Sequence, residues 1–523
     1  MDRNGKIMIF LVVILSILFS ITCVFFFHEV FSKRQKTGAD GQTPTAPSAD
    51  LTPALPEDLL PKNLYVGRKA PEAVFVSSAG ESVLLMDIAQ NAENGVVVSF
   101  GEPMCGALCE QMTASCGFSH VVVGSADYSD ATALIVSDPD NAVYKSWGIQ
   151  ALPSVVVISS LGDVLEYHTG KISIGEMKGL LRRARDGRSS VSIAFIENSM
   201  SDGNGGFATN TSPHGSSPYG RDVLSESQGL IMLYALAADN RALFDKTWQF
   251  TRSNLLKNGI AAWYVRSDGA QADVNALLDD LRIWYALYQA GSQWNDAYAQ
   301  DAESMLAGIK ENCLDDKNRL VDYTDLNNGT RAGTISLQYL DLSILKLMAE
   351  ADHDFEDIRQ KAENILLDGR ISDEFPLYYK NYDYSSRAYD QGNLNTAEAL
   401  YTLWNLSKAG LLQEDSLNWL RNNVEKGTLA ARYRKNGSPV SGYEYHSTAV
   451  YGLAALIAKE MNDDSLFEMA VRRMERQFVL DEKDSCYGAY TQKGAVIYSF
   501  DQMIPLLVNA YVDRITGDGK SEG

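Results

Sequence analysis

The feature that most constrains this fold is a long succession of helical segments in the C-terminal part of the chain. From residue 225 to about residue 514, apolar residues recur at helical spacing. The clearest segments are 230–237, 276–289, 336–349, 396–408, 448–459 and 503–511, with more polar helical stretches between them. Twelve helices here would take roughly 25 residues each with their loops, a size typical of helical hairpins with short connections. The pattern predicts an all-α domain over 188–518 and suits an (α/α)6 barrel.

One of these helices begins at Ser225-Glu226-Ser227-Gln228-Gly229. The spacing of Ser225 and Gln228 predicts a capping box, which places Glu226 in the first turn. Acidic residues are favoured there by the helix macrodipole whether or not they do chemistry. The motif, followed by an apolar helix and D-N-R-x-L-F-D-x-x-W, resembles the S-E-G-x-G-Y-G-M helix of glycoside hydrolase family 8. The resemblance implies a six-hairpin glycosidase in which Glu226 is the general acid.

Glycoside hydrolysis needs a second carboxyl group, and the resemblance implies inversion, with the two groups about 6.5–9.5 Å apart. Asp279 and Asp280 begin a helical segment similar to the family's A-x-D-x-D-L, where an aspartate stabilises the sugar. Asp280 aligns with the second aspartate of that motif, but Leu278 stands at the first and Asp279 is displaced by one. Both are therefore candidate substrate-binding residues, and two solvated acids at a helix start are the alternative.

The candidate bases lie in the run Tyr382 to Asp390. Asp383, with Arg387 after it, resembles the family's Y-D-A-x-R segment, although the arginine comes one residue late. Asp390 is an equally placed alternative. Surface loop acids are the competing interpretation of both.

Aromatic side chains that stack on sugar rings are expected along the cleft. The segment from Ser336 to Leu342 is similar to the family's N-P-S-Y-x-D-P, which makes Tyr339 a candidate substrate-binding residue. Trp263, Tyr389 and Tyr490 are further candidates. Most aromatic residues of such a barrel lie in its core, which is the alternative for each.

Short β-rich runs at 73–76, 95–100, 120–123 and 154–158 alternate with helical or turn segments and predict an α/β sheet over 63–187. The region resembles the thioredoxin superfamily, including a turn before Pro153 where that family places a cis-proline. Cys105 and Cys109 follow the second of these strands, but at C-x-x-x-C rather than C-x-x-C spacing. A redox pair, which could also join Cys105 to Cys116, an inert docking domain and a metal site remain open alternatives.

Residues 7–27 carry no charge and are long enough to span a bilayer as a helix. They predict a single-pass membrane anchor after a cytoplasmic stub (1–6). A linker rich in Thr, Pro and Ala over 28–62 would then tether an extracytoplasmic body. Cys23 raises the alternative of a lipoprotein, but no small residue precedes it and the apolar run continues past it.

The formal net charge of −21 disfavours nucleic-acid partners and favours a neutral or basic substrate. Six cysteines in so long a chain do not make a disulfide framework, and no cofactor or metal is implied. Together with the apolar run at 7–27, the resemblance to glycoside hydrolase family 8 implies a membrane-anchored glycosidase acting on a β-linked exopolysaccharide. A non-catalytic surface glycan-binding or scaffold protein and an extracytoplasmic thiol-disulfide oxidoreductase with a helical appendage are the alternatives.

Overall fold

The computed structural model describes residues 60–101, 112–124, 133–138, 140–212, 221–445, 447–492 and 494–517. Contacts within the chain gather Leu55–Gly523 into one compact unit. The predicted stub, the predicted membrane anchor at 7–27 and nearly all of the linker lie outside the described residues. Within the described ranges, no helix is both long enough and apolar enough to cross a bilayer.

A mixed sheet forms the N-terminal α/β region, in the strand order β2-β1-β5-β4-β3-β6-β7. Strands β3, β4 and β5 run parallel to one another, and the remaining neighbours pair antiparallel. The bounds are β1 (Val74–Ser77), β2 (Ser82–Leu84), β3 (Gly95–Phe100), β4 (Phe118–Val123), β5 (Leu134–Ser137), β6 (Ser154–Ile158) and β7 (Val164–Thr169). The four predicted strands are thus confirmed as β1, β3, β4 and β6.

The centre of the sheet is buried on both faces, as a continuous apolar run predicts for a parallel strand. Every residue of β3 is buried. Helices α2 (Leu85–Gln90), α4 (Ala142–Trp147) and α5 (Ile174–Asp186) accompany the strands. The peptide bond between Leu152 and Pro153 is cis, as the resemblance implied.

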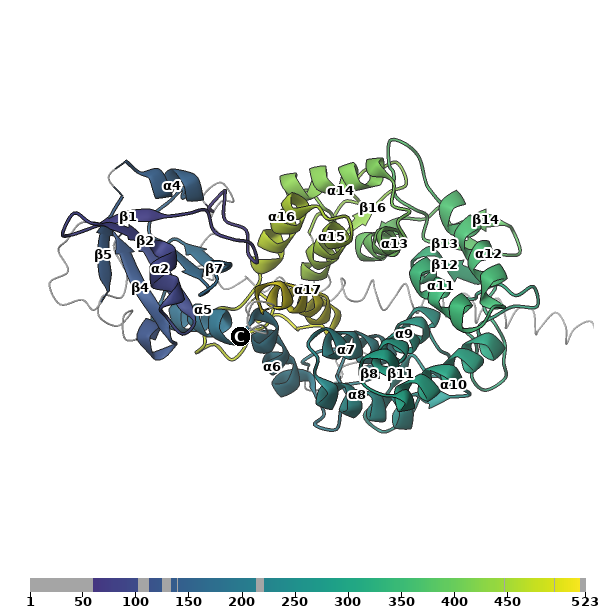
Figure 1. The fold of residues 1–523 in the computed structure, drawn as a ribbon. Coiled ribbons are helices and arrows are strands. Elements are labelled where there is room, and N and C mark those ends of the chain that lie inside the picture. The colour runs from purple at the N-terminus through teal and green to yellow at the C-terminus, as the bar shows by residue number, and fades with distance from the viewer. Residues whose placement is uncertain are drawn as a thin grey trace, which may run out of the picture. The chain divides into compact units, whose positions relative to one another are not determined.

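The helical region contains twelve α-helices among the described residues. They are α6 (Arg188–Met200), α7 (Ser225–Ala237), α8 (Arg241–Asn254), α9 (Leu277–Gln293), α10 (Asp296–Asn312), α11 (Leu342–Ala351), α12 (Phe355–Asp368), α13 (Thr396–Lys408), α14 (Glu414–Lys426), α15 (Thr448–Glu460), α16 (Asp464–Glu475) and α17 (Phe500–Gly517). Helices α7, α9, α11, α13, α15 and α17 form an inner ring, which closes where α17 packs on α7 (Figure 1). The other six pack outside them, which confirms the predicted (α/α)-barrel-like fold.

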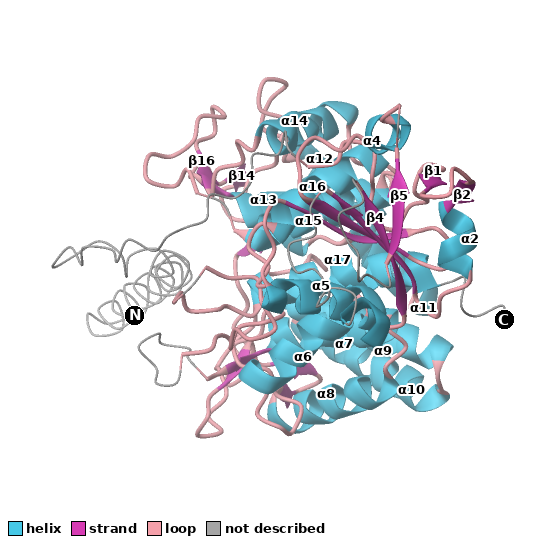
Figure 2. Ribbon diagram, turned by 90° about the vertical axis from the view of Figure 1, so that its left-hand side faces the viewer, coloured by secondary structure: helices cyan, strands magenta, loops and turns pink. Residues whose placement is uncertain are grey.

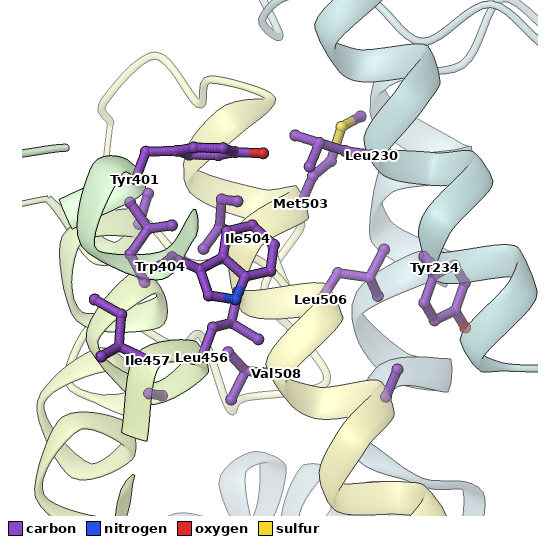
Figure 3. Close-up of a cluster of buried hydrophobic side chains, with 14 of the residues drawn as sticks. Leu230, Tyr234, Tyr401, Trp404, Leu456, Ile457, Met503, Ile504, Leu506 and Val508 are labelled. Carbon is purple, nitrogen blue, oxygen red and sulfur yellow. The ribbon is translucent and has the colours of Figure 1, made fainter. Parts of the chain in front are cut away.

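Burial explains which helices are inner. All residues of α15 from Thr448 to Ala458 are buried, whereas the outer helix α8 buries mainly one face. Side chains of α7, α13, α15 and α17 meet in the middle of the ring, among them Leu230, Trp404, Leu456 and Leu506 (Figure 3).

Short antiparallel strands precede the N-termini of several inner helices. They are β8 (Val223–Leu224) with β11 (Tyr264–Val265), β9 (Leu256–Lys257) with β10 (Ile260–Ala261), β15 (Leu394–Asn395) with β16 (Arg432–Tyr433), and the set β12 (Thr334–Ser336), β13 (Asn381–Asp383) and β14 (Ala388–Tyr389). Figure 2 shows long loops gathered on one side of the helices, and the short strands β14 and β16 are labelled among them. These loops position the residues that begin the inner helices.

Buried ion pairs join the α/β region to the helices. Arg183 of α5 donates to both carboxylate oxygens of Glu475 on α16, at 2.6 and 2.7 Å. Glu166 of β7 accepts from Arg188 of α6 at 2.7 Å and lies 3.3 Å from Arg183 Nε. Close packing accompanies these pairs, since a Cβ on Gly179 would lie 1.8 Å from the carbonyl oxygen of residue 480. Charge pairing and close packing therefore both hold α5 against the helical region.

Candidate active site

The first turn of α7 carries the motif that begins with Ser225, but it is not a capping box. Leu224 occupies the N-cap position in an extended conformation, and its side chain makes no capping hydrogen bond. Gln228 instead accepts from the backbone N–H of Phe207 at 3.0 Å and donates to the carbonyl of Gly205 at 2.8 Å. The predicted capping box is therefore wrong, because the loop before α7 uses the Gln228 amide to fix its own path.

Glu226 has the accessible side chain of this turn. Ser225, Ser227 and Gln228 are all 0% exposed, whereas Glu226 is half-buried. Its charge contributes to raising the pKa of Arg282 and that of Tyr339. Glu226 therefore lies close to side chains from α9 and from the segment before α11.

A chain of buried hydrogen bonds ties three inner helices together beside Glu226. Ser225 Oγ donates to Asp279 Oδ2 at 2.6 Å, and Arg282 Nη1 donates to Asp279 Oδ1 at 2.9 Å. Arg282 Nη2 also donates to the hydroxyl of Tyr401 on α13, at 2.8 Å. A Cβ on Gly229 would lie 2.9 Å from Arg282 Cδ, so the glycine of the motif leaves room for this arginine.

Asp279 and Asp280 point to different surroundings. Asp280 is 0% exposed and accepts from Ala261 N at 2.7 Å and from Asn275 Nδ2 at 2.6 Å, and burial raises its pKa to about 8. Burial also raises the pKa of Asp279, although Arg282 and the Ser225 hydroxyl oppose the shift. The structure thus brings Asp279 beside the turn of Glu226, whereas Asp280 holds the backbone of the preceding loop in the core.

Tyr339 lies within electrostatic reach of several acids. It ends the 3-10 helix η2 (Leu337–Tyr339), which packs against α9 and α13. Burial raises the pKa of the Tyr339 hydroxyl well above its usual value, and the charges of Asp322, Asp279, Glu398 and Glu226 add to the shift. The protonated hydroxyl is thus a potential hydrogen-bond donor on which the charges of four acids act.

Sequence reasoning missed Asp322 and Glu398. Asp322 accepts from Thr334 Oγ1 and from Ser336 N, both at 2.6 Å, and burial raises its pKa. Glu398 stands in the first turn of α13, with its Oε2 3.8 Å from Lys380 Nζ and without a hydrogen bond to any residue that the structure describes. Glu398 could have been proposed as a candidate from the sequence, because it is an acid at the start of an apolar helix. The sequence around the loop residue Asp322 contains no comparable pattern.

The candidate bases Asp383 and Asp390 lie on the β13–β14 hairpin. Asp383 Oδ1 accepts from the backbone N–H and the hydroxyl of both Ser385 and Ser386, at 2.6–2.9 Å. The Ser385 hydroxyl, together with these other bonds, lowers the pKa of Asp383. Asp390 is exposed and accepts from Gly392 N at 3.0 Å. Both acids therefore shape their own turns.

The other three predicted aromatic binding residues lie in unlike places, and the hydroxyl of Tyr389 donates to the backbone carbonyl of Ile365 at 2.7 Å. The carbonyl of Trp263 accepts from Ser225 N at 3.0 Å, so the backbone of this half-buried residue lies next to the Glu226 turn. Tyr490 is 2% exposed, and its hydroxyl donates to Glu475 and accepts from Asn509, each at 2.9 Å. We call Glu226, Asp279, Asp322 and Glu398 the acid cluster. Because Tyr490 belongs to the buried network beside the α/β region, the structure does not bring it to this cluster.

The predicted redox cysteines, Cys105 and Cys109, lie outside the described residues. Cys116, the third member of that group, is a free, half-buried thiol. His120 bonds Ser99 at 2.9 Å and His168 lies 3.3 Å from a backbone carbonyl. Among the residues described, no group of three His, Cys, Asp or Glu side chains is arranged to hold a metal ion.

Comparison with known proteins places this geometry in context. The profile of glycosyl hydrolases family 8 matches residues 215–319. YdaJ of Bacillus subtilis (strain 168), which carries the name of a lipoprotein, is 29% identical over 294 residues, covering 54% of this chain and 78% of YdaJ. An endoglucanase of Cellulomonas uda is 37% identical over 91 residues, 16% of this chain and 25% of its own length.

Two solved structures share the fold. A protein described as a novel alpha-amylase from Clostridium perfringens is 31% identical, with a TM-score of 0.58 over 62% of this chain and 97% of its own. PssZ from Listeria monocytogenes is 20% identical, with a TM-score of 0.50 over 62% of this chain and 96% of its own.

Proposed function

Because the chain belongs to glycosyl hydrolases family 8 and is a glycoside hydrolase, we propose that it cuts a β-linked polysaccharide internally by acid/base hydrolysis with inversion. In this proposal, Glu226 protonates the leaving glycosidic oxygen and a second carboxylate activates water on the opposite side of the sugar. An exopolysaccharide is the proposed substrate. Asp279 and Tyr339 hold the sugar, and Trp263 lies at the edge of the same site.

The observation that carries the proposal is the position of Glu226 next to other acids. A carboxylate in the first turn of a helix is stabilised as an anion by the macrodipole, yet a general acid must keep its proton until it reacts. The charges of Asp279, Asp322 and Glu398 act on the Tyr339 hydroxyl together with that of Glu226. Paired carboxyl groups reconcile these two demands in other sites, and they supply the second carboxyl group that the proposed hydrolysis needs.

Three carboxylates are proposed as the base. Asp383 and Asp390 follow from the resemblance, and Glu398 follows from the geometry. In the ring order, α13 lies opposite α7, so Glu398 and Glu226 occupy first turns on opposite helices. One carboxylate oxygen of Glu398, Oε2, is buried without a hydrogen-bond partner among the residues that the structure describes, which favours Glu398 among the three.

The test is a comparison of wild type with Glu226→Gln. Both are incubated with cellulose derivatives, xylan, chitosan, bacterial exopolysaccharides and starch, the last because one similar structure is described as an alpha-amylase. We expect wild type to shorten a β-linked polymer with inverted product anomers, and Glu226→Gln to fold normally without cleaving it. Full activity of the variant would contradict the role of Glu226, and cleavage of starch alone would contradict the β-linkage.

Membrane attachment is proposed from two observations. Residues 7–27 form an uncharged apolar run, and YdaJ is named as a lipoprotein. We propose a single-pass anchor with an extracytoplasmic body. Carbonate extraction of membranes containing wild type or Cys23→Ser tests this: both proteins should stay membrane-bound, whereas release of only the variant would indicate a lipid anchor.

A non-catalytic glycan-binding role is the second candidate. The observation in its favour is Leu278, which stands where the family's sugar-stabilising aspartate is expected. Retention of glycan by wild type without any new reducing ends would support this role.

A further inference from the structure

A hollow of about 760 Å³ lies outside the acid cluster and takes no part in the proposed hydrolysis. It is lined by the loop after α6, by the C-terminal half of α8 and by the ends of β8 and β11. This volume lies within the range of roughly 300–1,000 Å³ that is usual for small-molecule sites. The hollow is therefore large enough to hold sugar units.

The lining of the hollow combines an apolar floor with a polar rim. Met200, Ala208, Val223 and Val265 are buried at its floor, and the ring of Phe250 is half-buried beside them. The exposed side chains of the rim include Asn204, Gln249, Ser253 and Asn254. An aromatic face with surrounding amides and hydroxyls suits a sugar ring, whose C–H groups pack on the ring and whose hydroxyls need both donors and acceptors.

The rim carries positive charge on an otherwise acidic chain. Arg221, Lys246 and Arg266 line the hollow with one acid, Asp202, and Arg266 pairs with Asp268 at 3.5 Å, while the whole chain has a formal charge of −21. Asp202 already accepts two backbone N–H bonds within its own loop. Among the residues that the structure describes, no side-chain hydrogen bond or ion pair engages Lys246 or Gln249. The local charge therefore disfavours an amino sugar and accepts a neutral or acidic one.

The hollow adjoins the acid cluster through one ribbon. Val223 pairs with Val265 and Leu224 with Tyr264, and the next backbone bond, from Ser225 N to Trp263 O, is 3.0 Å long. Val223 and Glu226 are three residues apart in the chain, which allows at most roughly 10 Å between them. A polysaccharide seated in the hollow thus has only a short distance to span to the acid.

We propose that this hollow is a second glycan-binding site, which holds neutral or acidic sugar units of the polymer away from the bond that is cut. The proposal rests on the proposed function, because it assumes that the ligand is the same polysaccharide. Phe250 stacks on a sugar ring, and Lys246 and Gln249 donate to its hydroxyls.

The test measures binding without turnover. The Glu226→Gln protein is run in native gels containing each polysaccharide of the panel, alone and combined with Phe250→Ala or with Lys246→Ala. Arg252→Ala is the matched control, because Arg252 lies on the same helix, pairs with Asp301 at 3.3 Å and does not line the hollow. We expect Phe250→Ala and Lys246→Ala each to weaken retardation about five- to tenfold, and the control to leave it unchanged.

The outcomes separate this site from the hydrolysis. If wild type cleaves a glycan that retards all variants equally, the second site is refuted and the hydrolase function stands. If nothing is cleaved but the hollow variants lose retardation, the site stands and the hydrolase function fails. Hydroxyl-radical footprinting gives a check without substitutions: Phe250 should be protected by the retarding glycan. Unchanged oxidation of Phe250, or no retardation of the Glu226→Gln protein by any glycan, would overturn the proposal.

Discussion

Ser225 Oγ donates a 2.6 Å hydrogen bond to Asp279 Oδ2, which joins the first turns of α7 and α9 next to Glu226. Asp279→Asn removes the charge that pairs with the buried guanidinium of Arg282. We expect kcat to fall about 100-fold, because a displaced α9 or α7 turn misplaces the acid. Steady-state kinetics check this. Ser227→Ala is the control, because Ser227 is as buried as Ser225 but donates to Ser499, and we expect this variant to keep wild-type kinetics. Equal losses of kcat in Asp279→Asn and Ser227→Ala would contradict the role of Asp279.

Gly229→Ala should lower activity more than stability. Alanine is the better helix former by about 1 kcal/mol, but its Cβ would lie 2.9 Å from Arg282 Cδ. Arg282 cannot easily move aside, since its guanidinium is held by Asp279 and Tyr401. We expect a lower kcat with a change in melting temperature of only a few degrees. Unchanged kcat would show that Arg282 adapts without disturbing the acids.

The three candidate bases can be separated by variants that preserve side-chain shape. If Glu398 is the base, Glu398→Gln should reduce kcat about 1,000-fold or more, within the range that general-base catalysis supplies. Asp383→Asn and Asp390→Asn should then retain most activity, with some loss for Asp383→Asn because the hairpin turn is weakened. Initial rates on the same polymer measure all three. If only Asp383→Asn or only Asp390→Asn loses activity, the general base is that aspartate of the hairpin and not Glu398.

The buried carboxyl of Asp280 should make stability depend on pH. Its pKa is about 8 in the folded chain, above the usual value near 3.8, so the folded state retains a proton that the unfolded chain releases. The free energy of unfolding should therefore be highest below about pH 4 and fall as the pH rises to about 8. Denaturant unfolding between pH 4.5 and 8.5 measures this slope. Asp280→Asn should flatten it, and an unchanged slope would mean that Asp280 is ionised throughout.

The junction between the α/β region and the helices should be sensitive to loss of one charge. Glu475→Gln leaves Arg183 and Arg188 buried with less compensation, which typically costs roughly 3–5 kcal/mol. Denaturant unfolding should show this loss. Glu363→Gln on α12 breaks only a partly exposed pair with Arg359 and should cost about 1 kcal/mol or less. Similar losses for both would show that the junction adds nothing to stability.

The sequence by itself was sufficient for many of the elements and for one candidate site residue. The helical period predicted the inner helices, the β-rich runs predicted β1, β3, β4 and β6, and the resemblance around Ser225 pointed to Glu226. These features are local, because burial along one helix or strand is written into the spacing of its apolar residues.

Only the tertiary structure decided which other acids accompany Glu226. Adjacent residues of a helix point about 100° apart, so a shift of one position separates Asp279, beside Ser225, from Asp280, in the core. The closure of the ring sets α13 opposite α7, with Glu398 in its first turn, and it directs Tyr490 to Glu475 rather than to the acids. Spacing along the chain contains neither the rotation of each helix nor the order in which helices meet, because both depend on packing between segments far apart in sequence.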